Sequence, residues 1–487
     1  MAFTLTGDDV CQPTLPTSIP DPYWVAFSPS AAKLVNIPLN ENNFPLDQSW
    51  LPVLAGNELS TSKHQFSNPI STVYSGHQFG VWAGQLGDGR AILLGDIAGQ
   101  ELQLKGAGKT RFSRMGDGRA VLRSSIREFL CSEAMYALGI PTTRALSIVG
   151  SDLPVRRETM ETAAVCARLA PSFIRVGHFE HFASLQNIER LKELADSLMH
   201  QHYPDCLDVD NSYLALFKAI CERNAKLVAQ WQAVGFCHGV LNSDNISVLG
   251  LTMDYGPYGF LDQFQIDHIC NHSDQGGRYA YHRQPQIIHW NMACLASAMI
   301  PLVELQSGET AQNLLREALE EFPVIYAQTW QDLFRKKLGF FASHEGDVAL
   351  IERLMHMMHE SRVDFTNFFR NLGKLEMTMN PSQISLRDDF INREEIERWF
   401  SDYIARLRNE SSVDLPRREM MNLVNPKYVL RNHLAQIAIE KAQNKDFSEV
   451  EKLLNILSKP YAEQSEYESY ATSPPDNFPA VEVSCSS

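Results

Sequence analysis

The segment His238-Gly-Val-Leu-Asn-Ser-Asp-Asn245 is followed a short distance later by Asp254-Tyr-Gly256. Asn245 and Asp254 offer an amide oxygen and a carboxylate oxygen, which are hard ligands suited to Mg²⁺ or Mn²⁺. Either segment alone fits an ordinary turn, because Asn, Asp and Gly are common turn residues. Together, their order and spacing indicate a metal site that acts on a phosphate compound.

Protein kinases have a catalytic His-Arg-Asp, a metal-binding Asn five residues after that Asp, and a later Asp-Phe-Gly whose Asp binds magnesium. In this chain Val240 stands where kinases have the catalytic Asp, and Asn245 lies five residues beyond it. The spacing therefore predicts a kinase-like catalytic loop. Valine cannot accept a proton, however, so Asp244, next to the candidate metal ligand, is the candidate replacement for the kinase base.

An upstream pair of residues completes the pattern. Lys105 ends an alternating segment that follows the glycine-rich turn 84–89, and Glu128 lies in the predicted helix 120–138. In kinases a strand lysine holds the phosphates, and a helix glutamate fixes its flexible side chain. The pair alone is a weak signal, because the glycine spacing differs from G-x-G-x-x-G. Combined with the two candidate metal ligands, it predicts an ATP site.

Charge is distributed unevenly. The formal net charge of −15 argues against nucleic acid as a partner, because phosphate backbones are bound mainly by Lys and Arg. Residues 105–127 nevertheless contain seven basic side chains, four glycines and one acid, Asp117. A solvated helix face is the plain alternative, but it has no need of glycines. The stretch therefore favours a site for a small, concentrated anion.

Hydrophobic periodicity predicts an α+β protein with a β-rich N-lobe, a helical C-lobe and additional C-terminal helices. The kinase-like order of the motifs above indicates that these parts form a kinase-like, two-lobed fold. The strands are expected at 81–82, 90–94, 101–105, 144–149 and 163–169. Besides 120–138, the helices are expected at 185–202, 213–234, 287–303, 311–322, 393–408 and 426–441. Asn425 before Pro426 fits an N-cap with proline at the first helical position.

Five units follow from this pattern. They are an N-terminal extension (1–69), the N-lobe with the phosphate site (70–170), the C-lobe with the metal and catalytic loop (171–340), a helical region (341–460) and an extended acidic tail (461–487).

Composition predicts a cytoplasmic protein that does not enter a membrane. The nine cysteines show no Cys-x-x-Cys pair, the apolar runs are too short to span a bilayer, and no signal-peptide pattern opens the chain.

Several long strings resemble the selenoprotein O family: YSGHQFGVWAGQLGDGR at 74–90, LKGAG at 104–108, GDGRAVLRSSIRE at 116–128 and the catalytic loop 238–245. The segment 425–433 matches as well. Members of this family are kinase-fold, pseudokinase-derived protein adenylyltransferases, which bind ATP in a flipped orientation. The resemblance implies that this chain, as a cysteine-containing bacterial member, transfers AMP to Ser, Thr or Tyr hydroxyls of protein substrates.

The resemblance also implies roles for residues at the matching positions. Those that would contact the nucleotide are Gly87, Gly89, Arg90, Asp117 and Gly118. Those that would hold its phosphates are Lys105, Arg168 and Arg175, with Glu128 as the partner of Lys105. Those that would bind Mg²⁺ or Mn²⁺ are Asn245 and Asp254, of which Asp254 also belongs to the ATP site, and Asp244 would accept the proton.

Cys485 lies where some family members carry selenocysteine, so the resemblance implies a redox role for the tail. Cys270 falls in the region that corresponds to a kinase activation segment, between Asp254 and Pro285, and this position makes it the candidate disulfide partner.

Two other functions stay open at this stage: a kinase that uses Asp244 as its base, and an inactive ATP-binding scaffold. The aromatic strip from Tyr74 to Trp82 fits either packing or contact with adenine.

Overall fold

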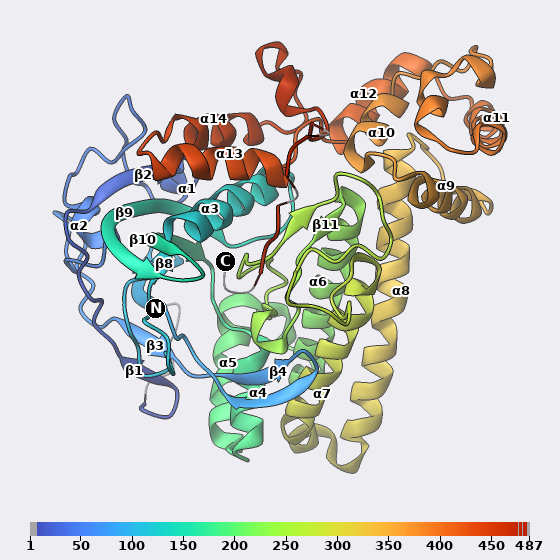
Figure 1. The fold of residues 1–487 in the computed structure, drawn as a ribbon. Coiled ribbons are helices and arrows are strands. Elements are labelled where there is room, and N and C mark those ends of the chain that lie inside the picture. The colour runs from blue at the N-terminus through green and yellow to red at the C-terminus, as the bar shows by residue number, and fades with distance from the viewer. Residues whose placement is uncertain (1–6, 476, 480, 485–487) are drawn as a thin grey trace.

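A computed structural model describes residues 7–475, 477–479 and 481–484. Its centre is an antiparallel sheet with the strand order β1-β3-β6-β7-β10-β9-β2, in which β8 also pairs with β10 (Figure 1). The strands are β1 (Cys11–Pro13), β2 (Tyr23–Phe27), β3 (Ile70–Thr72), β6 (Ala91–Ile97), β7 (Gln100–Lys105), β8 (Ala120–Val121), β9 (Arg144–Arg156) and β10 (Met160–Ala170). The protein is thus a mixture of helices and an antiparallel sheet, which agrees with the predicted combination of helices and strands.

Polar and apolar residues alternate along β7, but not because one face of the strand is exposed to solvent. Leu102 and Leu104 face the apolar core, but Gln103 and Lys105 on the other face are also buried. Lys105 meets Glu128 of α3 (Leu122–Ala137), and Gln103 accepts a hydrogen bond from Arg168 of β10. The polar positions of this strand therefore face a buried polar site rather than solvent.

The N-terminal segment belongs to the same sheet. β1 pairs with β3, and β2 pairs with β9. The helices α1 (Pro29–Leu34) and α2 (Trp50–Leu54) pack on the apolar side of the sheet against residues such as Ile92. The predicted boundary between the N-terminal extension and the N-lobe, at residue 70, therefore separates strands that pair with each other in one sheet.

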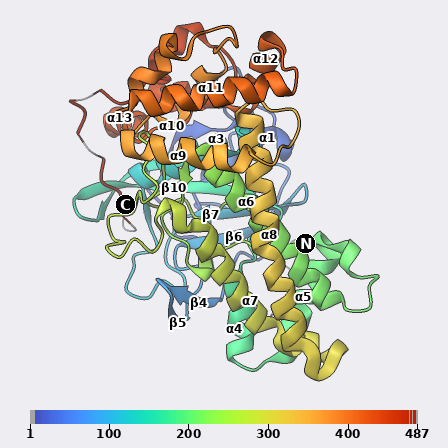
Figure 2. The same ribbon diagram turned by 90° about the vertical axis from the view of Figure 1, so that its right-hand side faces the viewer.

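The helical part begins with α4 (Val176–Ser184) and α5 (Ile188–His202), followed by the buried α6 (Ser212–Val234). Helices α7 (Gln284–Ser307) and α8 (Ala311–Lys337) pack on α6 and on each other (Figure 2). One stretch within Tyr281–Lys337 is long and apolar enough to cross a membrane by length and composition, but 56% of it is buried inside the protein. A short β11–β12 hairpin (Phe236–Cys237 and Gly259–Phe260) brackets the predicted catalytic loop.

The C-terminal helices form two groups. The helices α9 (Asp347–Ser361), α10 (Phe365–Leu372), α11 (Arg393–Asn409) and α12 (Asp414–Val424) surround a hydrophobic core that contains Trp399 and Tyr403 and continues to Phe334 of α8 and Cys237 of β11. The other group, α13 (Asn432–Gln443) and α14 (Ser448–Leu457), packs on α3 (Figure 1). Only the first group lies apart from the sheet.

Three details of the sequence prediction are wrong. Asn425 is not an N-cap: it follows α12, and its side-chain amide donates to the Lys337 carbonyl. The helix predicted from 426 begins at Asn432, because residues 428–430 run without regular structure and bury their side chains in the main core. The helix predicted to end at 322 continues through Pro323 to Lys337.

Candidate active site

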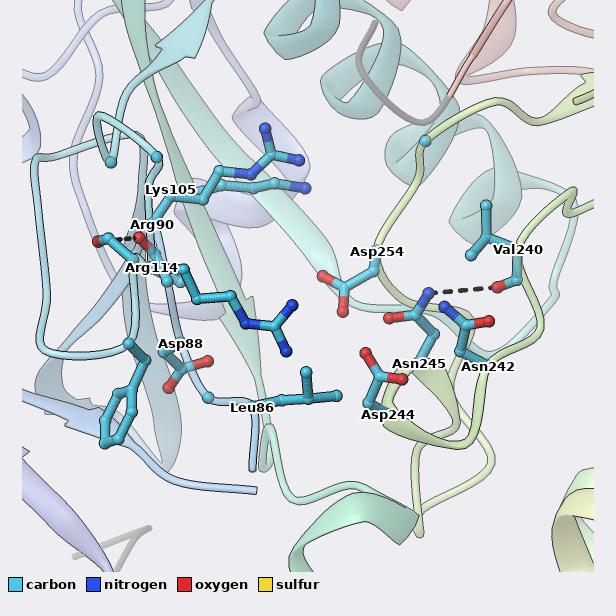
Figure 3. A pocket seen from close by; sticks show the side chains of 18 of the residues that line it. Leu86, Asp88, Arg90, Lys105, Arg114, Val240, Asn242, Asp244, Asn245 and Asp254 are labelled. Carbon is cyan, nitrogen blue, oxygen red and sulfur yellow. Dashed lines mark hydrogen bonds between the residues drawn. The ribbon is translucent and has the colours of Figure 1, made fainter. Parts of the chain in front are cut away.

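A cavity of about 750 Å³ lies between the sheet and the segments around residues 240 and 254 (Figure 3). Among its lining residues are all those predicted to contact the nucleotide, its phosphates or the metal. These are Gly87, Gly89, Arg90, Lys105, Asp117, Gly118, Arg168, Arg175, Asp244, Asn245 and Asp254. Glu128 stands behind Lys105 on α3. The chain therefore brings the whole predicted set to one place.

A buried ion-pair network forms the sheet side of the cavity. The Lys105 amine donates to Glu128 at 2.6 Å, and Arg168 reaches the other oxygen of Glu128 at 3.0 Å. Burial favours the neutral form of each group, and it lowers the pKa of Lys105. Burial would raise the pKa of Glu128, but Lys105 and Arg168 outweigh it and hold that pKa below its usual value. The carboxylate thus fixes two cations at the cavity wall.

Asp254 is held by two arginines. Arg168 donates to one carboxylate oxygen at 2.7 Å, and Arg175 donates to the other at 2.6 Å. Burial alone would raise the pKa of Asp254, but Arg175, Arg168 and Lys105 hold it well below its usual range. Asp254 also has a left-handed backbone with φ of 56°, a conformation that few residue types other than Gly, Asn and Asp adopt. The surrounding cations therefore favour the charged form of this carboxylate, which lines the cavity.

Asp244 and Asn245 lie together in the short 3₁₀ turn Ser243–Asn245. The Asn245 amide nitrogen donates to the Val240 carbonyl at 3.3 Å, which leaves its oxygen directed toward Asp254 (Figure 3). One oxygen of Asp244 accepts a weak bond from Gln78 at 3.3 Å. The other is buried and has no hydrogen-bond partner among the described residues. Burial raises the pKa of Asp244 to about 6, although Arg175 and Gln78 act in the opposite direction.

The glycines of the two loops are required by close packing. A Cβ at Gly87, where φ is 145°, would lie 2.4 Å from the Phe112 ring. A Cβ at Gly118 would lie 2.2 Å from the Gly108 backbone. Asp117 stands at the rim and pairs with Arg157 at 2.8 Å. The two glycine-rich loops therefore pack directly against neighbouring backbone and rings, and no other residue type fits at these two positions.

The cavity also contains residues that the sequence prediction did not assign. Asp88 is buried and accepts from the Thr72 backbone at 2.9 Å and from its hydroxyl at 2.6 Å. Burial raises the pKa of Asp88, with Arg175 and Thr72 opposing. Arg114 enters from the second loop (Figure 3). Asp88 lies between Gly87 and Gly89, which were predicted to contact the nucleotide. Its position in this motif could therefore have indicated that it lines the cavity.

The aromatic strip 74–82 serves two surfaces. Tyr74 lines the cavity, and the Arg175 guanidinium lies 4.7 Å from its ring centre. Trp82 lies in β5 (Val81–Gln85), which pairs with β4 (Ser75–Gln78), and it packs on His77 away from the cavity. The strip is thus part packing and part cavity wall.

Of the two cysteines in the predicted disulfide, the structure describes only Cys270. The Cys270 thiol donates to the Cys237 carbonyl at 3.4 Å, and Cys485 lies outside the described residues. Nearby, the His272 amide donates to the Val483 carbonyl at 2.9 Å. The tail therefore reaches the segment that contains Cys270, as Figure 1 also shows, and the pairing itself stays a prediction.

One cavity that combines a lysine–glutamate pair, two buried arginines, and amide and carboxylate oxygens is typical of a nucleotide-dependent transferase. The chain belongs to the family described as protein adenylyltransferase SelO, whose model matches residues 32–458.

Curated relatives agree with this assignment. A protein nucleotidyltransferase YdiU of Cupriavidus metallidurans is 52% identical over 97% of this chain and 88% of its own length. Another, from Burkholderia multivorans, is 51% identical over 100% of this chain and 95% of its own length. A third, from Ralstonia nicotianae, is 52% identical over 96% of this chain and 91% of its own length. The similarity thus extends over nearly the full length of each protein.

Proposed function

We propose that this chain is a protein adenylyltransferase that transfers AMP from ATP to hydroxyl groups of target proteins and releases pyrophosphate. The observation that carries the proposal is the pair of buried arginines at Asp254, combined with Val240 at the position of the kinase base. A kinase-like, two-lobed fold is part of the proposal. It is supported by the order of strand lysine, helix glutamate, catalytic loop and Asp-Tyr-Gly around one cavity.

The donor set fits a divalent metal. Asp254 supplies a charged carboxylate and Asn245 an amide oxygen directed toward it, which are the ligand types that Mg²⁺ and Mn²⁺ prefer. When bound, such a metal neutralises phosphate charge. Arg168 and Arg175, which bond to Asp254 in this structure, would be available to bind phosphate if this carboxylate held a metal.

The distribution of cations supports the flipped orientation of ATP. Lys105, Arg168 and Arg175 are all buried on the inner side of the cavity, where they suit the β- and γ-phosphates. The α-phosphate then faces Asp244. The acceptor oxygen attacks the α-phosphorus, the bond to the bridging oxygen of the β-phosphate breaks, and the hydroxyl proton passes to Asp244. Charge growing on pyrophosphate is stabilised by the buried cations.

Labelled ATP tests this proposal directly. Label at the α-phosphate should become attached to protein, and label at the γ-phosphate should leave as pyrophosphate. Attachment of γ-label alone would instead support a kinase that uses Asp244, and bound ATP with neither transfer would support a scaffold. The retained ATP-binding and metal-ligand set speaks against the scaffold, because presenting a surface does not need it.

The pH dependence should identify the proton acceptor. Asp244 must be ionised to accept a proton, and burial raises its pKa to about 6. Transfer should therefore rise about tenfold per pH unit below pH 6 and level off above it. Asp244→Asn should lower the turnover rate by about 10²–10⁴-fold, with ATP affinity changed much less. An unchanged turnover rate in this variant would leave Asp244 only a structural neighbour of Asn245.

We further propose a conditional disulfide between Cys270 and Cys485 that lowers activity, in a protein located in the reducing cytoplasm. Two thiols would lose two electrons and two protons to a disulfide oxidant such as oxidised glutathione. Peptide mapping after oxidation, without reductant, should find the two cysteines joined. Cys270→Ser should abolish both the bridge and the loss of activity. A Cys237–Cys270 bridge, or a free Cys485, would contradict the proposal.

A further inference from the structure

Three metal-binding side chain types meet outside the cavity described above. His77 comes from β4, Glu180 from α4 and Cys294 from α7. One ligand atom of each residue lies within 4.8 Å of the others, and His77 Nδ1 is 2.6 Å from Glu180 Oε1. Three elements far apart in sequence thus deliver a nitrogen, an oxygen and a sulfur atom to one point.

The carboxylate in this group is not fully satisfied. Glu180 is 5% exposed, and its Oε2 atom is buried with no hydrogen-bond partner among the described residues. Buried polar atoms without a partner are uncommon in folded proteins, and a missing ion is one of the recognised causes. A cation at this point would give the second oxygen a partner.

A separate cavity of about 510 Å³ opens at the group. His77, Glu180 and Cys294 all line it, together with Trp82 and Trp290. The imidazole of His77 is packed edge-on against both tryptophans, with ring centres 5.1 and 5.2 Å apart. The ring is therefore held in place, while the cavity offers an entry path and room for a water molecule.

We propose that His77, Glu180 and Cys294 form a binding site for a zinc-class divalent metal, with water from the adjacent cavity as fourth ligand. Imidazole and thiolate ligands favour Zn²⁺ over Mg²⁺ or Ca²⁺, which prefer oxygen. Ligand atoms in a tetrahedral zinc site lie about 3.3–3.8 Å apart. The present spacing needs only a small adjustment, in which the hydrogen bond between His77 and Glu180 opens to admit the ion.

The site would position a part of the proposed active site without touching substrate. The His77 backbone amide donates to Ser243 Oγ at 2.8 Å, and the next residue, Gln78, contacts Asp244. α4, which carries Glu180, begins immediately after Arg175. A metal here would join the β4–β5 hairpin to α4 and α7, directly behind the turn that carries Asp244. This inference does not depend on AMP transfer.

Cobalt titration tests the site without an activity measurement. The full chain is treated with a chelator, kept reduced with a reductant that does not bind metals, and titrated with Co²⁺. One equivalent should produce a thiolate-to-cobalt absorption band and quench fluorescence from the tryptophans beside His77. An ion at Asn245 and Asp254 cannot produce this band, because both are oxygen ligands.

Variants locate the ion. Cys294→Ser should abolish the band, and Glu180→Gln should weaken Co²⁺ binding by at least about tenfold. Two matched controls should leave the band unchanged: Cys206→Ser, at a buried thiol elsewhere, and His356→Ala, which removes an exposed His–Glu pair. Cys294→Ser differs from the wild type by a single atom, so it tests the site even if a larger truncation such as His77→Ala fails to fold.

Zinc should also stabilise the protein measurably. Because an ion that binds only the folded state raises stability, excess Zn²⁺ should raise Tm of the wild type by a few degrees and that of Cys294→Ser much less. Absence of the thiolate band from the wild-type chain, or its persistence in Cys294→Ser, would overturn the proposal.

Discussion

Asp254→Asn should lower AMP transfer by at least about 1,000-fold, since a charged metal ligand contributes several kcal/mol to a phosphate reaction. The substitution keeps the size of the side chain, and asparagine tolerates the left-handed backbone at this position. What is lost is the negative charge, which we propose binds the metal. Asp254→Ala should be at least as inactive, with added backbone strain.

The same substitution should also reduce stability, because Arg168 and Arg175 lose their shared carboxylate in a buried site. Removing one partner of a buried ion pair costs about 3–5 kcal/mol of unfolding free energy. Transfer of α-label and urea unfolding measure the two effects separately. Asp152→Asn, at an exposed pair with Lys445, is the control and should change neither. Activity within tenfold of wild type, in folded Asp254→Asn, would contradict the assigned role.

The sequence was most informative where function demands particular residue types in a fixed order. Lys105, Glu128, Asn245 and Asp254 could be paired in advance, because a strand lysine, a helix carboxylate and two oxygen ligands recur together in phosphate chemistry. The structure places them around one cavity. The ion pairs that these residues form could not be predicted from motif order. Arg168 was predicted to grip phosphate, but in the structure it holds Asp254 and Glu128.

Features that depend on distant parts of the chain were missed. The first strands pair with residues far along the sequence, so residues 1–69 looked like an extension although β1 and β2 lie in the sheet. Asn425 and Pro426 have the local signature of a helix start. Tertiary contacts override it: Asn425 bonds to the end of α8, and Tyr428 packs into the main core. Glu180 gave no local signal, because its partners come from β4 and α7.

Lys105→Ala should lower α-label transfer by about 10²–10³-fold, because it removes a buried cation that we propose balances pyrophosphate charge. Stability should change less than for Asp254→Asn, since Glu128 keeps its bond to Arg168 at 3.0 Å. Lys105→Arg should not restore activity, because a planar guanidinium does not replace the compact charge of a lysine amine in a closed site. The matched control is Lys218→Ala, whose ion pair with Glu321 is exposed and should contribute little. If Lys105→Ala binds ATP and transfers AMP at the wild-type rate, the phosphates lie elsewhere in the cavity, and the flipped orientation loses its main support.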